Sequence, residues 1–538
     1  MTAHAPLAAS LVQSVDWVAV APPLIAALTG LVALVADLFT SERNKAVLGW
    51  ISVAGLAAAT LALLPLRGDD RTTFCLTADP TACSYSADRF ALTVQLLVLA
   101  GALLTALLSV TAVRDEKLPA GEFWFLLLSS AAGAALLPAS RDLATLIVAL
   151  EVASLPAFAL VGMRRGDRMS SEAALKFFLS SVTATAVTLL GVSFVYATTG
   201  SLHLGRIADG LDEVPAGLDT LAVTGVALTL VGFAFKTAAV PFHFWVPDTY
   251  VGAPLPIAAY LSVIGKAVGF TGLILVTVLA FPAYSHVWGP ALAVLAALTM
   301  TLGNAAALRQ DPGRAHSAVR LLAWSSVGQA GYLLVPLAAA AYAGRDQIGS
   351  TVAYALMYAA ANLGAFAVVA LVARTAPLGR VEDFRGLYAR RPLAALSLAF
   401  FLLCLAGLPP GVIGLFAKVA VFRSAVDAGL GWLAVLMALN VVAALAYYLK
   451  WTALLFRTAP AAAEAPTAPT KDTTAARAGE APGEPATAPE GALPAPAARP
   501  RPPLPVTLTV ALTGLVALVL SGAPQLVLRF ATGSLFPQ

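Results

Sequence analysis

The stretch 221-LAVTGVALTLVGFAFKTAAVPFHFW-245 decides the fold, because it is long and apolar enough to cross a membrane yet contains a lysine and a proline. A helix of about 20 apolar residues crosses a hydrocarbon core of about 30 Å. Runs of this kind recur along the whole chain, whose residues are 59% hydrophobic and only 12% charged. Soluble domains have about 25% charged residues. The sequence therefore predicts an all-α protein that crosses the membrane many times.

The apolar runs predict about fourteen transmembrane helices, which places both chain termini on one side of the membrane. The first run is too long for a signal-peptide core and lacks a basic n-region and a cleavage site, so we count it as a span. The approximate bounds are 15–39, 44–66, 88–112, 121–138, 142–162, 172–198, 218–241, 254–280, 288–308, 319–342, 348–373, 393–424, 430–456 and 504–530.

Lysine and arginine gather in loops on one side of this arrangement. Loops 41–45, 163–168, 309–320 and 374–391 together contain thirteen of them. The loops on the other side have few, and the richest is 67–89. By the positive-inside rule the four basic loops are cytoplasmic and both termini lie outside. We expect a multi-pass protein of the cell inner (plasma) membrane.

Two polar segments interrupt the apolar pattern. Cys75 and Cys83 share the loop 67–89, and they form a disulfide only if that loop faces an oxidising compartment, which the sequence leaves open. Segment 458–503 is rich in Ala and Pro and poor in large apolar residues, which predicts a disordered cytoplasmic linker. The cysteine spacing matches no iron–sulfur site, and no phosphate-binding loop is present in the sequence.

Charged residues in the middle of apolar runs are the main functional signal. A lysine there costs about 2.5–3.5 kcal/mol on insertion scales. Lys236, Lys266 and Lys418 occupy such positions, and Glu151 is a carboxylate in a similar one. Glu151 can pair with one lysine only, so at least two lysines must face water, a polar cavity or another subunit. Burial favours release of the lysine proton and a nearby carboxylate opposes it, so these groups predict proton transport.

Prolines near two of these lysines predict broken helices. Pro241 follows Lys236, and Pro409 and Pro410 precede Lys418. A proline breaks the hydrogen-bond ladder, and the freed backbone groups are tolerated only where protein or a wet cavity satisfies them. Broken helices in corresponding places predict a transport site between inverted repeats, here two five-helix repeats (spans 4–8 and 9–13) with helices 7 and 12 broken.

The predicted divisions of the chain follow from these repeats. They are an N-terminal three-helix segment (1–118), the first antiporter-like repeat (119–283), the second inverted repeat (284–457), the Ala/Pro-rich linker (458–503) and a C-terminal helix (504–538).

Lys176 and His243 are further candidates. Lys176 lies about one turn inside the basic end of its span, where it either assists the central lysines or extends to the interface. His243 follows Lys236 by seven residues, which is two turns along one face if the helix continues past Pro241. It would then connect Lys236 to the cytoplasm. The alternative is an interfacial histidine among the neighbouring aromatic residues.

The segment KTAAVPFHFWVPDTYVGAPLPIAAYLSVIGKAVGF (236–270) resembles the signature of the antiporter-like subunits of respiratory complex I and of multi-subunit cation/proton antiporters. The likeness extends over about 120–457. Segments 321–334, 382–392 and 408–422 are most similar to the members called subunit N, since subunit M typically has a glutamate where Lys418 stands. The resemblance implies a subunit of a proton-translocating NADH–quinone oxidoreductase. It places NADH, FMN, iron–sulfur clusters and quinone in partner subunits and no cofactor in this chain.

The resemblance also implies partners and residue roles. Glu151 and Lys236 become the pair of spans 5 and 7, Lys266 the connecting lysine of span 8 and Lys418 the terminal lysine of span 12, with Lys176 and His243 as auxiliary groups. The implied neighbours are subunit M on one side and the small subunit K on the other, within the lipid bilayer and without nucleic acid. Gln329 is a departure, because the family often has a titratable histidine there, and this puts a proton relay through that position in doubt.

Two other interpretations stay open. A D-type subunit of a Na⁺/H⁺ antiporter would transport ions without redox coupling. A structural membrane scaffold would hold the lysines as ion pairs, and replacing Lys266 or Lys418 by alanine would then leave turnover unchanged.

Overall fold

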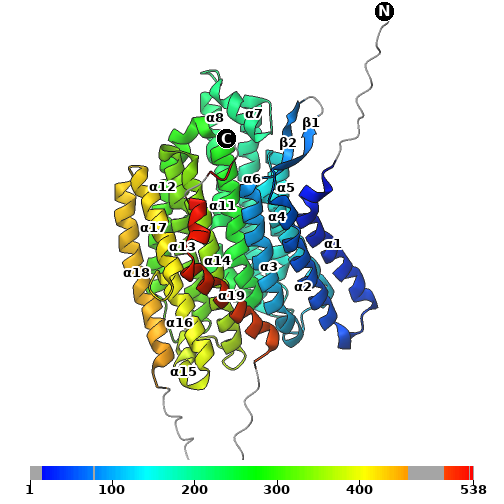
Figure 1. The fold of residues 1–538 in the computed structure, drawn as a ribbon, viewed down its shortest axis with the longest axis vertical. Helices are drawn as coiled ribbons and strands as arrows, with labels where there is room; N and C mark the ends of the chain where they lie inside the picture. Colours follow the sequence, from blue (N-terminus) through cyan, green and yellow to red (C-terminus); the bar gives the residue numbers. More distant parts are fainter. Residues whose placement is uncertain (1–14, 77–78, 459–501, 532–533, 537–538) are drawn as a thin grey trace, which may run out of the picture.

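The computed structural model describes residues 15–76, 79–458, 502–531 and 534–536. Almost all of the predicted linker 458–503 therefore lies outside the described residues. Within the described part, long helices run side by side along the longest axis of the molecule, as Figure 1 shows. The prediction of a nearly all-helical membrane protein is confirmed.

Thirteen helical segments of the described chain are long and apolar enough to cross a membrane, and a broken segment between them makes a fourteenth span. In chain order the spans are α1 (Trp17–Phe39), α2 (Ala46–Leu61), α3 (Arg89–Asp115), α4 (Ala120–Leu136), α5 (Leu143–Val161), α6 (Arg168–Thr199), α8 (Asp219–Thr237) with α9 (Trp245–Gly252), α10 (Leu255–Tyr260) with α11 (Lys266–Ile274), α12 (Ser285–Leu308), α13 (Ser317–Ala343), α14 (Ile348–Ala373), α16 (Pro392–Ala406) with α17 (Val412–Asp427), α18 (Gly431–Phe456) and α19 (Leu504–Gly522).

Span 7 is broken between α8 and α9, as the sequence predicts. Pro241 has no N–H, and its ring clashes with the carbonyl four residues earlier, which belongs to Thr237, the last residue of α8. Ala238 then takes a left-handed conformation with φ +68°. Side chains from elsewhere satisfy the freed backbone: the Val240 N–H donates to Thr299 Oγ1 at 2.9 Å and Trp245 Nε1 donates to the Phe235 carbonyl at 3.2 Å.

Span 12 is broken between α16 and α17, again as predicted. Gly407 ends α16 with φ +81°, a conformation that glycine adopts without strain. A Cβ atom at Gly414 would overlap the Cys404 carbonyl oxygen, so only glycine lets α17 pack this closely against the end of α16. The two halves contain 15 and 16 residues, too few for either to cross the membrane alone.

Span 8 has an irregular helix that the sequence did not reveal. A π-helical segment, Leu261–Gly265, separates α10 from α11, and a second one, Leu275–Ala280, follows α11. Such segments are rare in proteins, and those that occur often lie at functional sites. Lys266 is the first residue after the first of them.

The two predicted repeats pack their helices in the same order. In spans 4–8, α4 packs on α5 and α6 on the broken α8. In spans 9–13, α12 packs on α13 and α14 on both halves of the broken α16 and α17. The fourth helix of each set is therefore the interrupted one.

The loop 67–89 is not irregular but contains an antiparallel hairpin of β1 (Arg71–Leu76) and β2 (Asp79–Ala87). Cys75 lies opposite Cys83, and a disulfide joins them. The start of α1 lies at this hairpin, because the Arg71 guanidinium pairs with Asp16 at 2.9 Å. The described C-terminal residues reach the same end, since the Phe90 N–H donates to the Leu535 carbonyl.

Shorter helices complete the described structure. They are α7 (Leu204–Asp212), α15 (Leu387–Arg390), α20 (Gln525–Ala531) and the 3₁₀ turns Glu42–Asn44, Leu64–Leu66, Leu137–Ala139, Pro282–Tyr284, Arg345–Gln347 and Val381–Phe384. Figure 1 places α7 near the hairpin and α15 at the opposite end, which carries the four basic loops and is called the basic end below.

Candidate functional site: a buried lysine axis

Lys236 lies in the last turn of α8 and is only 4% exposed. Three aromatic rings surround its ammonium, with centroids at 4.9 Å for Phe158, 5.0 Å for Phe177 and 5.6 Å for Phe235. The negative faces of such rings attract a cation, and the negative end of a helix lies at its C-terminus. The sequence predicted a break near Lys236, and the structure places Lys236 in the last turn before that break.

Glu151 on α5 is the carboxylate whose charge acts on Lys236. It is half-buried, and its Oε1 accepts a hydrogen bond from Thr185 at 2.7 Å. No carboxylate oxygen of the described residues lies within 4.0 Å of the Lys236 ammonium. The two groups are therefore neighbours, as predicted, but they are not in a contact ion pair.

A small cavity of about 20 Å³ connects Lys236 with span 8. Its lining includes Ser130, Ser154 and Tyr260, together with residues next to Lys266 in the chain. Tyr260 donates to Ser130 at 2.9 Å. A cavity needs about 10–15 Å³ to hold a water molecule, so this one has the size for one.

Lys266 is the first residue of α11 and is 1% exposed. Within the part of the chain that the structure describes, its ammonium has no hydrogen-bond partner. Ser262 lies one turn before it on the same helix and accepts a hydrogen bond from Asn362 at 2.6 Å. The predicted central lysine is therefore buried with unused hydrogen-bonding capacity.

Lys418 is 3% exposed and lies in the middle of α17. Its ammonium donates to the carbonyls of Leu405 at 3.0 Å and Ala406 at 2.6 Å, the last two residues of α16. The ring of Tyr332 lies 5.7 Å from the ammonium. Lys418 thus caps the end of the broken helix, and a cation is favoured there for the same reason as at Lys236.

Polar side chains that the sequence analysis did not identify connect the Lys266 region with Lys418. Tyr358 donates to the Ser262 carbonyl at 3.0 Å and also bonds Ser326 at 2.7 Å. One turn further along α13, Gln329 donates to Tyr448 at 3.0 Å and accepts a hydrogen bond from Tyr354.

Gln329 completes this connection. Its Nε2 donates to the Leu405 carbonyl at 3.4 Å, and the same carbonyl accepts from Lys418. Gln329 therefore joins Tyr354 and Tyr448 to the carbonyl that Lys418 binds, although an amide side chain cannot titrate. The sequence signal for this position was the family's histidine, in whose place Gln329 stands.

The two auxiliary candidates, Lys176 and His243, lie apart from this row of polar side chains. Lys176 is half exposed and forms ion pairs with Glu172 at 2.8 Å and Asp248 at 3.0 Å, eight residues after the start of α6. It lies farther inside the helix than the single turn expected, and its side chain reaches the surface.

His243 does not lie on a helix face shared with Lys236, because α8 ends at Thr237. The geometric premise of that prediction was wrong. His243 is half-buried, and its ring lies 5.6 Å from that of Trp324. Its Nδ1 has no hydrogen-bond partner among the described residues.

The chain was compared with known families and proteins. A family model described as NADH:quinone oxidoreductase/Mrp antiporter, TM, matches residues 140–444. "NADH-quinone oxidoreductase subunit N 2" of Streptomyces griseus is 70% identical over 98% of this chain and 96% of its own length. Subunit N of the same enzyme from Salinispora tropica is 48% identical over 84% of this chain and 87% of its own.

Solved structures agree with the fold. A chain of respiratory complex I from Thermus thermophilus, with bound aureothin, is 31% identical and has a TM-score of 0.70 over 95% of this chain and all of that one. A chain of the Mrp complex from Dietzia superposes with a TM-score of 0.76 over 95% and 96% of the two chains. At 22% identity, the Mrp likeness concerns the fold alone.

Proposed function

The chain belongs to the NADH:quinone oxidoreductase and Mrp antiporter family of membrane subunits, and on that premise we propose that it is the proton-translocating subunit N of an NADH–quinone oxidoreductase. Its buried lysines carry protons through the membrane. Partner subunits bind NADH, FMN, the iron–sulfur clusters and quinone and perform the electron transfer. This chain supplies the ionisable groups and the hydrogen-bonded path between them.

The observation that carries this proposal is the row of polar side chains from Ser262, one turn before Lys266, to Lys418. A structural scaffold would pair each buried lysine with a carboxylate, because an unpaired buried charge is costly. Among the described residues, no carboxylate oxygen lies within 4.0 Å of Lys236, Lys266 or Lys418. Rings, helix ends and hydroxyl groups surround them instead, which suits groups that gain and lose a proton.

In the proposed mechanism, charge movement in the neighbouring subunits shifts Glu151. When its carboxylate comes closer, Lys236 holds its proton, and when it withdraws the proton is released. The small cavity beside Ser130 and Tyr260 leads that proton towards Lys266. The row of polar side chains leads the proton from there to Lys418, and Lys418 releases the proton on the outer side.

The proposed orientation places the basic end in the cytoplasm and both termini outside, in the plasma membrane. The distribution of Lys and Arg among the loops supports it. The proposed neighbours are subunit M on one side and subunit K on the other. The divisions 119–283 and 284–457 then form the two transport units, and the matching helix order of spans 4–8 and 9–13 supports this division.

A D-type antiporter subunit is the less supported function. The likeness to the Mrp complex is one of fold at 22% identity, while relatives at 70% and 48% identity are called subunit N of NADH-quinone oxidoreductase. Inverted vesicles separate the two functions, because only complex I acidifies their interior on NADH addition with sensitivity to piericidin or rotenone.

Lys236→Ala in the whole complex tests the lysine path. We expect assembly to persist and NADH-driven proton pumping to fall at least about a hundredfold, as for loss of a proton-transfer group. Lys450→Ala is the matched control, because Lys450 is an exposed lysine on α18. Unimpaired pumping by assembled Lys236→Ala complex would refute the proposal.

A further inference from the structure

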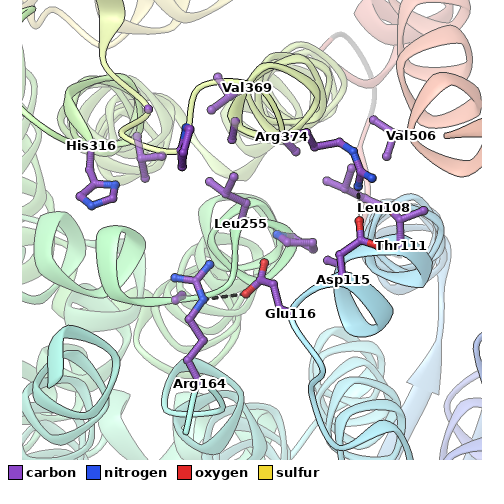
Figure 2. A pocket seen from close by; sticks show the side chains of 18 of the residues that line it. Leu108, Thr111, Asp115, Glu116, Arg164, Leu255, His316, Val369, Arg374 and Val506 are labelled. Carbon is purple, nitrogen blue, oxygen red and sulfur yellow. Dashed lines mark hydrogen bonds and ion pairs between the residues drawn. The ribbon is translucent and has the colours of Figure 1, made fainter. Parts of the chain in front are cut away.

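A pocket of about 480 Å³ opens at the basic end between the two repeats. Its lining comes from α3, the turn before α6, α10, the start of α13, the end of α14 and α19. Figure 2 shows the ion pairs Arg164–Glu116 and Arg374–Asp115 on one side of it and His316 on the other. Burial and the cations Arg164 and Arg320 lower the pKa of His316 below its ordinary 6.5.

The ion pairs link both repeats to the same helix end. Asp115 and Glu116 are adjacent at the end of α3. Glu116 holds Arg164 of the first repeat at 2.6 Å, and Asp115 holds Arg374 of the second. Two neighbouring carboxylates at the rim of the pocket are thus paired with both repeats.

Three of the helices that line this pocket also carry the central polar groups, two turns deeper. Leu255 lines the pocket and Ser262 follows it by seven residues on span 8. On α13, Val319 lines the pocket and Ser326 follows it by seven. Seven residues of helix span about 10 Å and return to nearly the same face.

The third helix, α14, runs in the opposite direction and reaches the same depth. Val369 lines the pocket, and Asn362 precedes it by seven residues. Asn362 is the residue that donates to Ser262. All three helices therefore lead from one pocket to one cluster of hydrogen-bonded side chains beside Lys266.

Tyr250 stands between the pocket and this cluster. The next residue, Val251, lines the pocket, whereas the Tyr250 side chain is fully buried. Its ring packs against Phe366 on α14, with centroids 6.2 Å apart, and its hydroxyl lies near Ser326 and Tyr358.

Buried polar atoms without partners mark the same place. Among the described residues, the Tyr250 hydroxyl, the Asn362 amide oxygen and the Lys266 ammonium each lack a hydrogen-bond partner. Buried polar groups are nearly always paired, and those that are not commonly bind ordered water. Two of these atoms belong to residues at the cluster and the third belongs to Lys266, which follows Ser262 by about one turn, and this points to water between the pocket and Lys266.

We infer that the pocket between α3, α10, α13 and α14 is a proton-uptake vestibule, and that the Tyr250 hydroxyl passes protons from it to the cluster beside Lys266. The inference rests on the proposed function and adds a second proton entry, while Lys236 keeps its role in driving proton release. The transferred group is a proton, taken from water in the vestibule and delivered to Lys266 through the hydroxyls of Tyr250 and Ser326.

Blocking the vestibule tests the inference directly. Ala373 is half-buried and lines the pocket, while Thr375 is exposed two residues later and does not line it. The chain has three cysteines, of which Cys404 is buried and the other two form the disulfide, so an introduced thiol is the only reactive one in it. Whole complex with Ala373→Cys or Thr375→Cys is treated with a bulky, membrane-impermeant methanethiosulfonate in inverted vesicles.

We expect the labelled Ala373→Cys complex to lose at least about tenfold in NADH-driven pumping, with recovery on reduction by dithiothreitol. Labelled Thr375→Cys complex should pump as before. Equal pumping by the two labelled variants would overturn the vestibule. That result would leave the proposed function intact if Lys236→Ala still abolished pumping, so the two failures are distinguishable.

Tyr250→Phe tests the hydroxyl itself. Because this hydroxyl lies near Ser326 but forms no regular hydrogen bond, its removal changes stability little, so a merely structural role predicts normal pumping. We expect pumping to fall at least about tenfold and the solvent deuterium isotope effect on it to rise. Tyr284→Phe, which removes a hydroxyl bonded to Asp219 at the hairpin end, is the control. Normal pumping with an unchanged isotope effect would remove Tyr250 from the path.

Discussion

At the scale of single residues, the three central lysines have different surroundings. Lys236 meets aromatic rings and Lys418 meets the last carbonyls of α16, while Lys266 meets no hydrogen-bond partner among the described residues. The ammonium groups of Lys236 and Lys418 therefore lie at the C-terminal ends of α8 and α16, where a cation is favoured without a fixed countercharge. The third lies between them, so it suits a group that passes a proton on.

Lys418 separates the structural from the functional part of this arrangement. We expect Lys418→Met to abolish pumping and also to destabilise the protein by about 1–3 kcal/mol, because the buried Ala406 carbonyl loses its donor and the Leu405 carbonyl keeps only Gln329. Lys418→Gln should abolish pumping with a smaller loss of stability, since an amide still donates. Pumping by the vesicles and thermal unfolding of the purified complex measure the two effects. Normal pumping by either variant would contradict the assigned role.

The central lysines were predictable from sequence because a charge in an apolar run is costly. The tyrosines, serines and amides between Lys266 and Lys418 were not predictable from sequence, because such side chains are common in the helix interfaces of membrane proteins. Gln329 shows the limit clearly. Sequence comparison with the family's histidine cast doubt on that position, whereas the structure joins Gln329 by hydrogen bonds to Tyr354, Tyr448 and the Leu405 carbonyl that Lys418 also binds.

At the scale of elements, the two breaks position the lysines. The prolines predicted both breaks, but not where each helix ends relative to its lysine. In span 7 the helix ends at Thr237 because the Pro241 ring excludes its carbonyl from the ladder. This also removed the basis for aligning His243 with Lys236.

The close packing of α17 on α16 provides a test at this scale. Gly414→Ala places a methyl group on the Cys404 carbonyl, so we expect a loss of more than about 3 kcal/mol of stability or failure to assemble. Gly431→Ala is the matched control, because nothing lies near its added Cβ atom. Thermal unfolding and the amount of assembled complex measure the difference. Equal stability of the two variants would refute the described packing.

The hairpin of β1 and β2 and the π-helical segments of span 8 were missed for physical reasons. The hairpin is short and lies in a polar loop, where hydropathy carries no signal. A π-helical segment has the same composition as the α-helix around it, so only the hydrogen-bond pattern distinguishes them.

At the scale of the whole molecule, hydropathy predicted the fourteen spans and their approximate bounds well. It did not predict which helices meet, because that depends on packing between segments far apart in the chain. The meeting of span 8, α13 and α14 at one pocket depends on such packing, so hydropathy could not predict it.

The disulfide at the hairpin tests the proposed orientation. In intact cells, a membrane-impermeant maleimide should label Cys75 and Cys83 only after treatment with an impermeant reductant, because the proposed orientation places the hairpin outside. The Cys75→Ser/Cys83→Ser double variant should give no label under either condition. Labelling that requires permeabilised cells would reverse the orientation.

The central claim is that protons cross through the buried lysine axis, and Lys266→Met tests it most directly. The Lys266 ammonium has no hydrogen-bond partner in the described structure, so a methionine of similar length costs little stability. Complex carrying Lys266→Met and matched complex carrying Lys450→Met are reconstituted into proteoliposomes, and protons moved per NADH oxidised are measured. We expect a clear drop for Lys266→Met and none for Lys450→Met. An unchanged ratio for fully assembled Lys266→Met complex would contradict the account.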